Sequence, residues 1–99
     1  MDKKVKLSDL KEIYHVIQEE LEWSGRMMEM YNQNRDASNE AYEKSKKARK
    51  EWQCKIKELE LPEHAERMLF HVAESMYFLD LVRFIRCCEL CRIEVDYEN

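Results

Sequence analysis

Glycine and proline are nearly missing from this chain of 99 residues, which has one of each and no threonine. Phosphate-binding loops and dinucleotide-binding turns need several glycines for close backbone approach, so a single glycine excludes both. It also excludes the Gly-x-Ser-x-Gly turn that carries a hydrolase nucleophile. An all-β domain needs more turn residues than are present. The composition predicts an all-α protein, and the length predicts a single helical domain over residues 1–99.

Long apolar runs are missing too. The N-terminus is charged and lacks the apolar stretch of a signal peptide. The most apolar segment, residues 76–90, carries four charged residues and is too short to cross a bilayer. We therefore expect a cytoplasmic protein that makes no membrane contact and keeps its four cysteines reduced.

Two breaks interrupt the helical pattern. Pro62 suits the first turn of a helix but not its interior, so one helix should end near Leu59 and another begin at Pro62. The polar run over residues 32–39 favours a turn, and Ser8 suits a helix N-cap. The sequence thus predicts a small antiparallel bundle of three helices, at about residues 8–31, 37–60 and 62–93.

The break at residues 32–39 has an alternative. An apolar seam with alternating spacings of four and three residues runs from Leu10 to Tyr31. The same frame continues without a phase slip to Leu59. One continuous helix over about residues 8–60 would explain this, and the fold would then be a long helical hairpin. Such an arm could not bury its seam alone, so this version predicts an oligomer.

The expected helix over residues 62–93 is apolar around most of its circumference, because two seams run along it. A helix of this kind is buried on several sides. We therefore expect a homo-oligomer, most simply a dimer, although a closed three-helix monomer would also cover the helix. Large aromatic side chains dominate interface energies. The expected interface residues are Met76, Tyr77, Phe78, Leu81, Arg83, Phe84, Ile85 and Arg86.

Two of these residues, Arg83 and Arg86, occupy seam positions where leucine is expected. A buried guanidinium needs an acidic partner. Asp80 or a glutamate of the first helix could supply it, or the two arginines could set the register between subunits or hold an acidic group of a partner.

Basic residues are concentrated between Lys44 and Lys57, where seven of them accompany one acidic residue. The rest of the chain carries the excess of negative charge. This segment could be a solvated helix face, or it could hold an anionic ligand with an indole stacked on a base. The residues for such a ligand are Lys46, Lys47, Arg49, Lys50 and Trp52. Because the net charge is −4, we do not expect nucleic acid as a partner, and strong binding to a duplex least of all.

The cysteines at positions 87, 88 and 91 lie late in a predicted helix, where the helix dipole raises a thiol pKa. A redox role is therefore not indicated, and the sequence leaves open whether Cys87, Cys88 and Cys91 bind a metal or only pack. The histidines lack the spacing of a zinc or di-iron site. No catalytic residue, metal or cofactor is expected.

These patterns predict a non-catalytic protein–protein interaction module. It would be an oligomeric helical adaptor or inhibitor that binds itself and another protein and modulates the latter. One alternative is an oligomeric sponge or sensor for a small anionic ligand such as a nucleotide. Another is an acidic mimic of nucleic acid that inhibits a nucleic-acid-binding enzyme.

Overall fold

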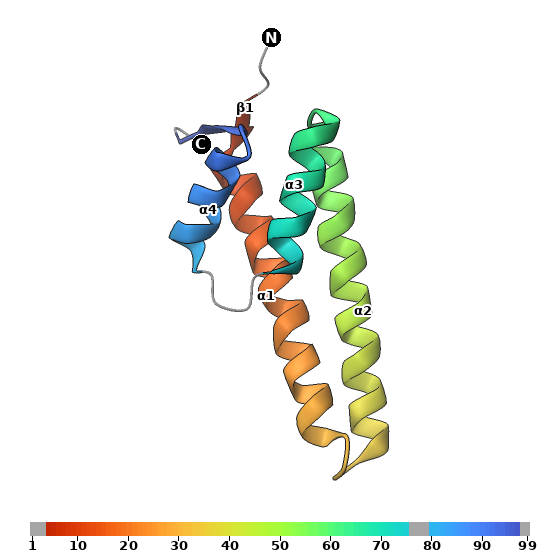
Figure 1. Ribbon diagram of the computed structural model, residues 1–99. Coiled ribbons are helices and arrows are strands. Elements are labelled where there is room, and N and C mark those ends of the chain that lie inside the picture. The colour runs from red at the N-terminus through yellow and green to blue at the C-terminus, as the bar shows by residue number, and fades with distance from the viewer. Residues whose placement is uncertain (1–3, 76–79, 98–99) are drawn as a thin grey trace.

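The computed structural model describes residues 4–75 and 80–97, and they are mostly helical, as the composition predicts (Figure 1). The elements in chain order are β1 (Lys4–Lys6), α1 (Leu7–Met30), α2 (Arg35–Glu58), α3 (Glu63–Glu74), α4 (Leu81–Leu90) and β2 (Glu94–Asp96). The two short strands were not expected from the sequence.

The chain turns back between α1 and α2, so the single helix over residues 8–60 is wrong. Asn34 adopts an extended backbone, with φ −152° and ψ 101°, and this conformation interrupts the helix. Its side-chain Oδ1 accepts the backbone N–H of Ala37 at 3.1 Å and thereby caps α2. The two helices then run antiparallel as a hairpin (Figure 1).

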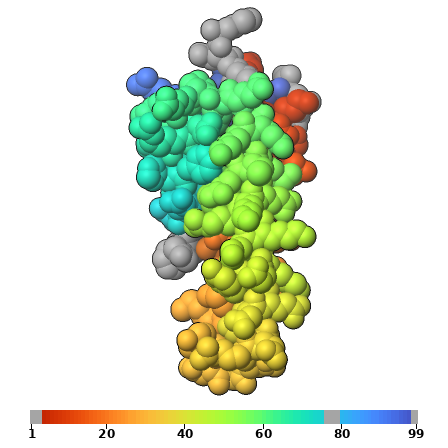
Figure 2. Space-filling view, turned by 90° about the vertical axis from the view of Figure 1, so that its right-hand side faces the viewer, coloured from red at the N-terminus to blue at the C-terminus, as the bar shows by residue number. Residues whose placement is uncertain are grey.

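Small residues hold the outer part of this hairpin together. The side of α2 that faces α1 buries Ser38, Ala41, Ser45 and Ala48. The hydroxyls of Ser24 and Ser45 lie 2.8 Å apart, and the Ser38 hydroxyl donates to the carbonyl of Met27 at 2.9 Å. The molecule measures 52 × 22 × 22 Å, and the turn end of the hairpin projects beyond α3 (Figure 2).

The single helix expected over residues 62–93 is also wrong, because the chain forms two helices there. α3 ends at Glu74, and α4 starts only at Leu81, where the Asp80 carboxylate accepts the backbone N–H of Arg83 at 2.8 Å. Each of the two apolar seams is therefore divided between two helices that pack separately. The expectation that one helix, apolar on all sides, must be buried against a second chain therefore loses its basis.

α4 ends in a Schellman turn. The backbone N–H of Ile93 donates to the carbonyl of Cys88 at 3.1 Å, and that of Arg92 donates to Glu89 at 3.0 Å. Arg92 holds φ 66°, a left-handed conformation that usually favours glycine. The turn directs the chain into β2.

β2 pairs with β1 in parallel, so the two ends of the described chain lie together. The register places Lys4 opposite Glu94, Val5 opposite Val95, and Lys6 opposite Asp96. Lysines of one strand thus face carboxylates of the other, and Lys4 Nζ lies 3.8 Å from Glu94 Oε1. The side chain of Val5, in the middle of β1, is buried in the core.

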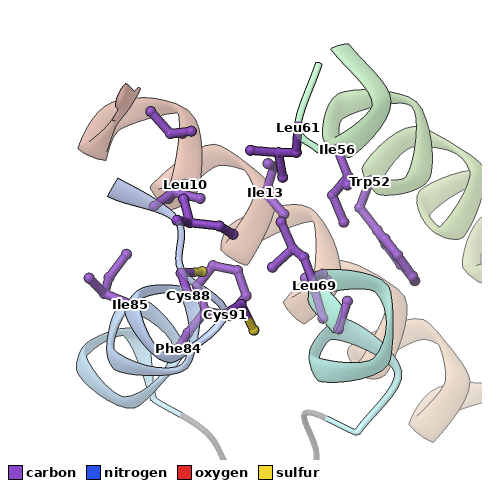
Figure 3. Close-up of a cluster of buried hydrophobic side chains, with 14 of the residues drawn as sticks. Leu10, Ile13, Trp52, Ile56, Leu61, Leu69, Phe84, Ile85, Cys88 and Cys91 are labelled. Atoms are coloured by element: carbon purple, nitrogen blue, oxygen red, sulfur yellow. The ribbon is translucent and has the colours of Figure 1, made fainter. Parts of the chain in front are cut away.

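The hydrophobic core lies between the inner half of the hairpin and the two shorter helices (Figure 3). All four helices contribute fully buried side chains: Leu10 and Ile13 from α1, Trp52 and Ile56 from α2, Leu69 from α3, and Phe84 and Cys88 from α4. The ring centroids of Phe84 and Tyr14 lie 5.7 Å apart, and those of Trp52 and Phe70 lie 5.8 Å apart. This core fixes α4 against the start of α1.

Candidate docking groove

The structure divides the interface residues that the sequence predicted. Met76, Tyr77 and Phe78 lie outside the described residues. Phe84 and Ile85 are only 0% and 7% exposed within one protomer. The prediction that Phe84 is an interface anchor is therefore wrong. The Phe84 side chain packs in the core of its own chain.

The remaining predicted interface residues lie on the outside of α4. Leu81 is half-buried, and Arg83 and Arg86 are exposed. Arg83 Nε lies 3.9 Å from Asp80 Oδ2, which is the local pairing that the sequence offered as one alternative. Neither arginine occupies the buried seam position that was expected, because α4 begins at its own cap and turns this side outward.

An apolar groove of about 310 Å³ lies between α4, the start of α1 and the end of β2. Three of the predicted interface residues, Leu81, Ile85 and Arg86, line it. The sequence reasoning did not select the others. The full lining consists of Leu7, Lys11, Leu81, Val82, Ile85, Arg86, Glu89 and Tyr97. We call this surface the α4 groove.

Large apolar side chains are exposed in and beside the α4 groove. Val82 is 77% exposed and Tyr97 is 56% exposed, and Leu90 at the end of α4 is 78% exposed. The sequence carries a signal for this once α4 is treated as a separate helix. Its inward face then repeats at Leu81, Phe84, Ile85 and Cys88, which leaves Val82 and Leu90 outside.

Three charged side chains, Lys11, Arg86 and Glu89, line the groove. Desolvation of its hydroxyl and the nearby Glu89 carboxylate raise the pKa of Tyr97, although the side chain is mostly exposed. The Glu89 carboxylate is the acidic group in the lining of the groove. Lys11 and Arg86 are exposed and form no ion pair within residues 4–75 and 80–97. The groove thus combines an apolar floor with two cations and one carboxylate, and none of the three is in an ion pair within the described residues.

The residues predicted to hold an anionic ligand do not form one site. Trp52 is 0% exposed, and its Nε1 donates to Glu20 Oε1 at 2.6 Å. The other oxygen of this carboxylate lies 3.3 Å from Arg49 Nε. The prediction that a ligand stacks on Trp52 is therefore wrong, because residues of the core cover the indole. Lys46, Lys47 and Lys50 remain exposed on α2.

Two of the three clustered cysteines are packed in the core, and Cys87 is partly buried. Cys88 is fully buried and Cys91 is nearly so. Burial raises the pKa of the Cys88 thiol to about 12 and also raises that of Cys91. In the part of the chain that the structure describes, no three His, Cys, Asp or Glu side chains are placed to hold a metal ion.

None of the described helices is both long enough and apolar enough to span a membrane. Comparison with protein families, curated proteins and solved structures finds no match. The α4 groove and the charged surfaces of the chain are the features that indicate a function.

Proposed function

We propose that this protein is a non-catalytic binding module that modulates another protein by docking it at the α4 groove. The occupant that fits is an apolar segment, such as an amphipathic helix, flanked by acidic residues. One observation carries the proposal: exposed Val82 and Tyr97 line a groove whose nearby cations, Lys11 and Arg86, have no acidic partner in the described residues.

The apolar part of the groove would supply most of the affinity. A partner that covers Val82 and fills the space beside Ile85 removes apolar surface from water, and such surface contributes about 25 cal/mol per Å² buried. The two cations would contribute more to partner choice and association rate than to affinity, because charges at an exposed rim are well screened. Arg86 can grip a carboxylate with two parallel hydrogen bonds, which Lys11 cannot do.

The expected homo-oligomer has less support than it had from the sequence. The seams that suggested it are now divided between α3 and α4, and Phe84 is core. A second copy of the chain could still cover Val82 and Leu90. We therefore treat self-association at the α4 groove as a competing outcome of the experiment, and a cytoplasmic setting as part of the same proposal.

The other two alternatives have weaker structural support. A nucleotide sponge loses its stacking residue, because Trp52 is in the core. An acidic mimic needs free carboxylates, but several glutamates pair with bases of the same chain. Glu12 pairs with Lys55, Glu22 with Arg26, and Glu63 with Arg67.

The proposal can be tested with three helical peptides that share one apolar face and differ only in flanking Glu, Gln or Lys residues. Fluorescence anisotropy should show the tightest binding to the native protein for the Glu-flanked peptide. Val82→Glu should abolish binding, and Arg86→Glu should remove the preference for Glu flanks. Met28→Glu is the matched control, because Met28 is 73% exposed at the far end of the hairpin, against 77% for Val82.

Equal binding of all three peptides, or equal loss with Met28→Glu and Val82→Glu, would contradict the proposal. Analytical sedimentation of the protein alone tests whether a second copy of the chain occupies the groove. A dimer that Val82→Glu dissociates would mean that a second copy of the chain fills the groove instead of a foreign segment.

A further inference from the structure

The charges of α2 are segregated around the helix. Residues that recur every three or four positions share one side of a helix. Along one such line, at positions 35, 39, 42, 46, 50, 53 and 57, α2 has no acidic residue. Its five acidic residues, Asp36, Glu40, Glu43, Glu51 and Glu58, lie off this line. We call the line the basic flank, after its principal members Arg35, Tyr42, Lys46, Lys50 and Lys57.

The lysines of the basic flank are free to bind. Lys46, Lys50 and Lys57 are exposed and make no ion pair with any described residue. Of the four basic residues of α2 that lie off the flank, Lys47 is also exposed without an ion pair to a described residue, and the other three are paired. Lys44 pairs with Glu40 at 3.4 Å, Arg49 with Glu20 at 3.3 Å, and Lys55 with Glu12 at 3.7 Å. The positive charge that the sequence placed in this segment is thus available mainly along one side.

An exposed aromatic ring continues the same line. Tyr42 is 47% exposed, and Lys46 Nζ lies 5.3 Å from the centre of its ring. At the turn end of the hairpin, Tyr31 is 52% exposed, with the guanidinium of Arg35 4.3 Å from its ring centre. Tyr42 therefore offers the flat surface that the sequence reasoning had assigned to Trp52. From Tyr42 to Lys57 the flank extends about 22 Å along the helix.

We propose that the basic flank of α2 binds single-stranded nucleic acid. A base stacks on Tyr42, and successive phosphates contact Lys46, Lys50 and Lys57. Rings that accept any base, together with cations that follow the backbone, are the two parts of a surface for single strands. An acidic protein face could use the lysines but would gain no stacking from Tyr42. The net charge of −4 confines the attraction to this one side of the molecule.

This surface is separate from the α4 groove. α2 and α4 lie on opposite sides of the molecule in Figure 1, and Figure 2 shows the surface of α2 open beside α3. The inference therefore adds a second binding surface and does not depend on what occupies the groove.

The test is the salt dependence of binding of a short fluorescein-labelled oligothymidylate, followed by anisotropy. Each phosphate contact to a single strand contributes about 0.7 to the slope of log K against log salt, so three lysines predict a slope of about −2. Lys46→Gln with Lys50→Gln should weaken binding and bring the slope to about −0.7. Tyr42→Ala should weaken binding about 5- to 150-fold with little change in slope.

The matched control is Arg26→Gln with Arg67→Gln, which changes the net charge equally on α1 and α3 and should leave binding unchanged. Inorganic polyphosphate is the second probe, because it offers phosphates without bases. Three results would overturn the inference: no binding at low salt, equal loss with the control variant, or polyphosphate binding that matches oligothymidylate while Tyr42→Ala has no effect. The last result would identify a general polyanion surface.

Discussion

Glu20 of α1 binds two side chains of α2 with its two carboxylate oxygens. Oε1 accepts the indole N–H of Trp52 at 2.6 Å, and Oε2 lies 3.3 Å from Nε of Arg49. The Glu20 side chain is only 14% exposed, and Trp52 is fully buried. This contact gives the largest core side chain its polar partner and takes one cation out of the basic surface of α2.

Replacement of Glu20 should destabilise the hairpin. Glu20→Ala leaves the buried indole N–H without an acceptor, which costs about 1–3 kcal/mol of unfolding free energy. Glu20→Gln keeps an acceptor and should cost less. Urea denaturation followed by tryptophan fluorescence measures both. An equal loss for the two variants would mean that the ion pair with Arg49, and not the indole, makes the contact important.

Substitution of Phe84 should lower the stability of the protein strongly, whereas substitution of Val82 should hardly change it. Phe84→Ala removes a fully buried ring and should cost about 3–5 kcal/mol, a large part of the 5–15 kcal/mol that holds a domain together. Val82 is 77% exposed, so Val82→Ala should change stability by less than about 0.5 kcal/mol. Phe84→Asp should unfold the monomer. A folded Phe84→Asp protein that has only lost an oligomeric partner would contradict the position of Phe84 in the core.

The buried Cys88 thiol should make stability fall at alkaline pH. Its pKa is about 12 in the folded protein, against 9.0 for an ordinary cysteine. Below pH 9 both states keep the proton, so this group causes no pH dependence there. Between pH 9 and 12 only the unfolded chain ionises, so Cys88 lowers the unfolding free energy by roughly 1.4 kcal/mol per pH unit.

The contribution of Cys88 is isolated by comparison with Cys88→Ala. The stability difference between the native protein and the variant should shrink as the pH rises above 9. In the native state, a thiol reagent should modify exposed Cys54 and leave Cys88 unmodified. Rapid modification of Cys88 in the folded protein would contradict its burial.

Gly25 is a stabilising substitution site. It lies inside α1, and a Cβ built there meets nothing within 4 Å. Gly25→Ala should therefore stabilise the helix by about 0.5–1 kcal/mol and raise Tm by a few degrees. Ser24→Ala is the neighbouring control and should do the reverse, because it breaks the 2.8 Å contact with Ser45. A lower Tm for Gly25→Ala would mean that some contact requires glycine there.

The sequence located the first turn well because its signal is local. The run of Asn, Asp and Ser residues after Tyr31 predicted a break, and Asn34 caps α2 as such residues do. The unbroken phase of the seam was misleading. The frame of alternating spacings that starts at Leu10 includes Tyr42 and Arg49, whereas Ala41 and Ala48, which lie outside the frame, are buried. Small side chains give a weak hydrophobic signal even where helices approach most closely.

Other features depend on contacts between distant residues. The pairing of Val5 with Val95 joins two three-residue strands from opposite ends of the chain, and such short strands have no clear periodicity. Asp80, which caps α4, is of a residue type common at helix N-caps, but the continuous apolar pattern around it favoured one long helix. The structure has two helices, α3 and α4, in place of that one. The exposed face of α4 and the α4 groove could therefore not be predicted, although three of the groove residues were named.

The most direct test of the proposed docking is a map of backbone amide chemical-shift changes when the Glu-flanked peptide is added. We predict changes over residues 7–11, 81–90 and 95–97, and none at the turn end of the hairpin. Arg86→Glu should remove them. Changes centred on residues 23–46, or a pattern that Arg86→Glu and Val82→Glu leave unaltered, would contradict docking at the α4 groove.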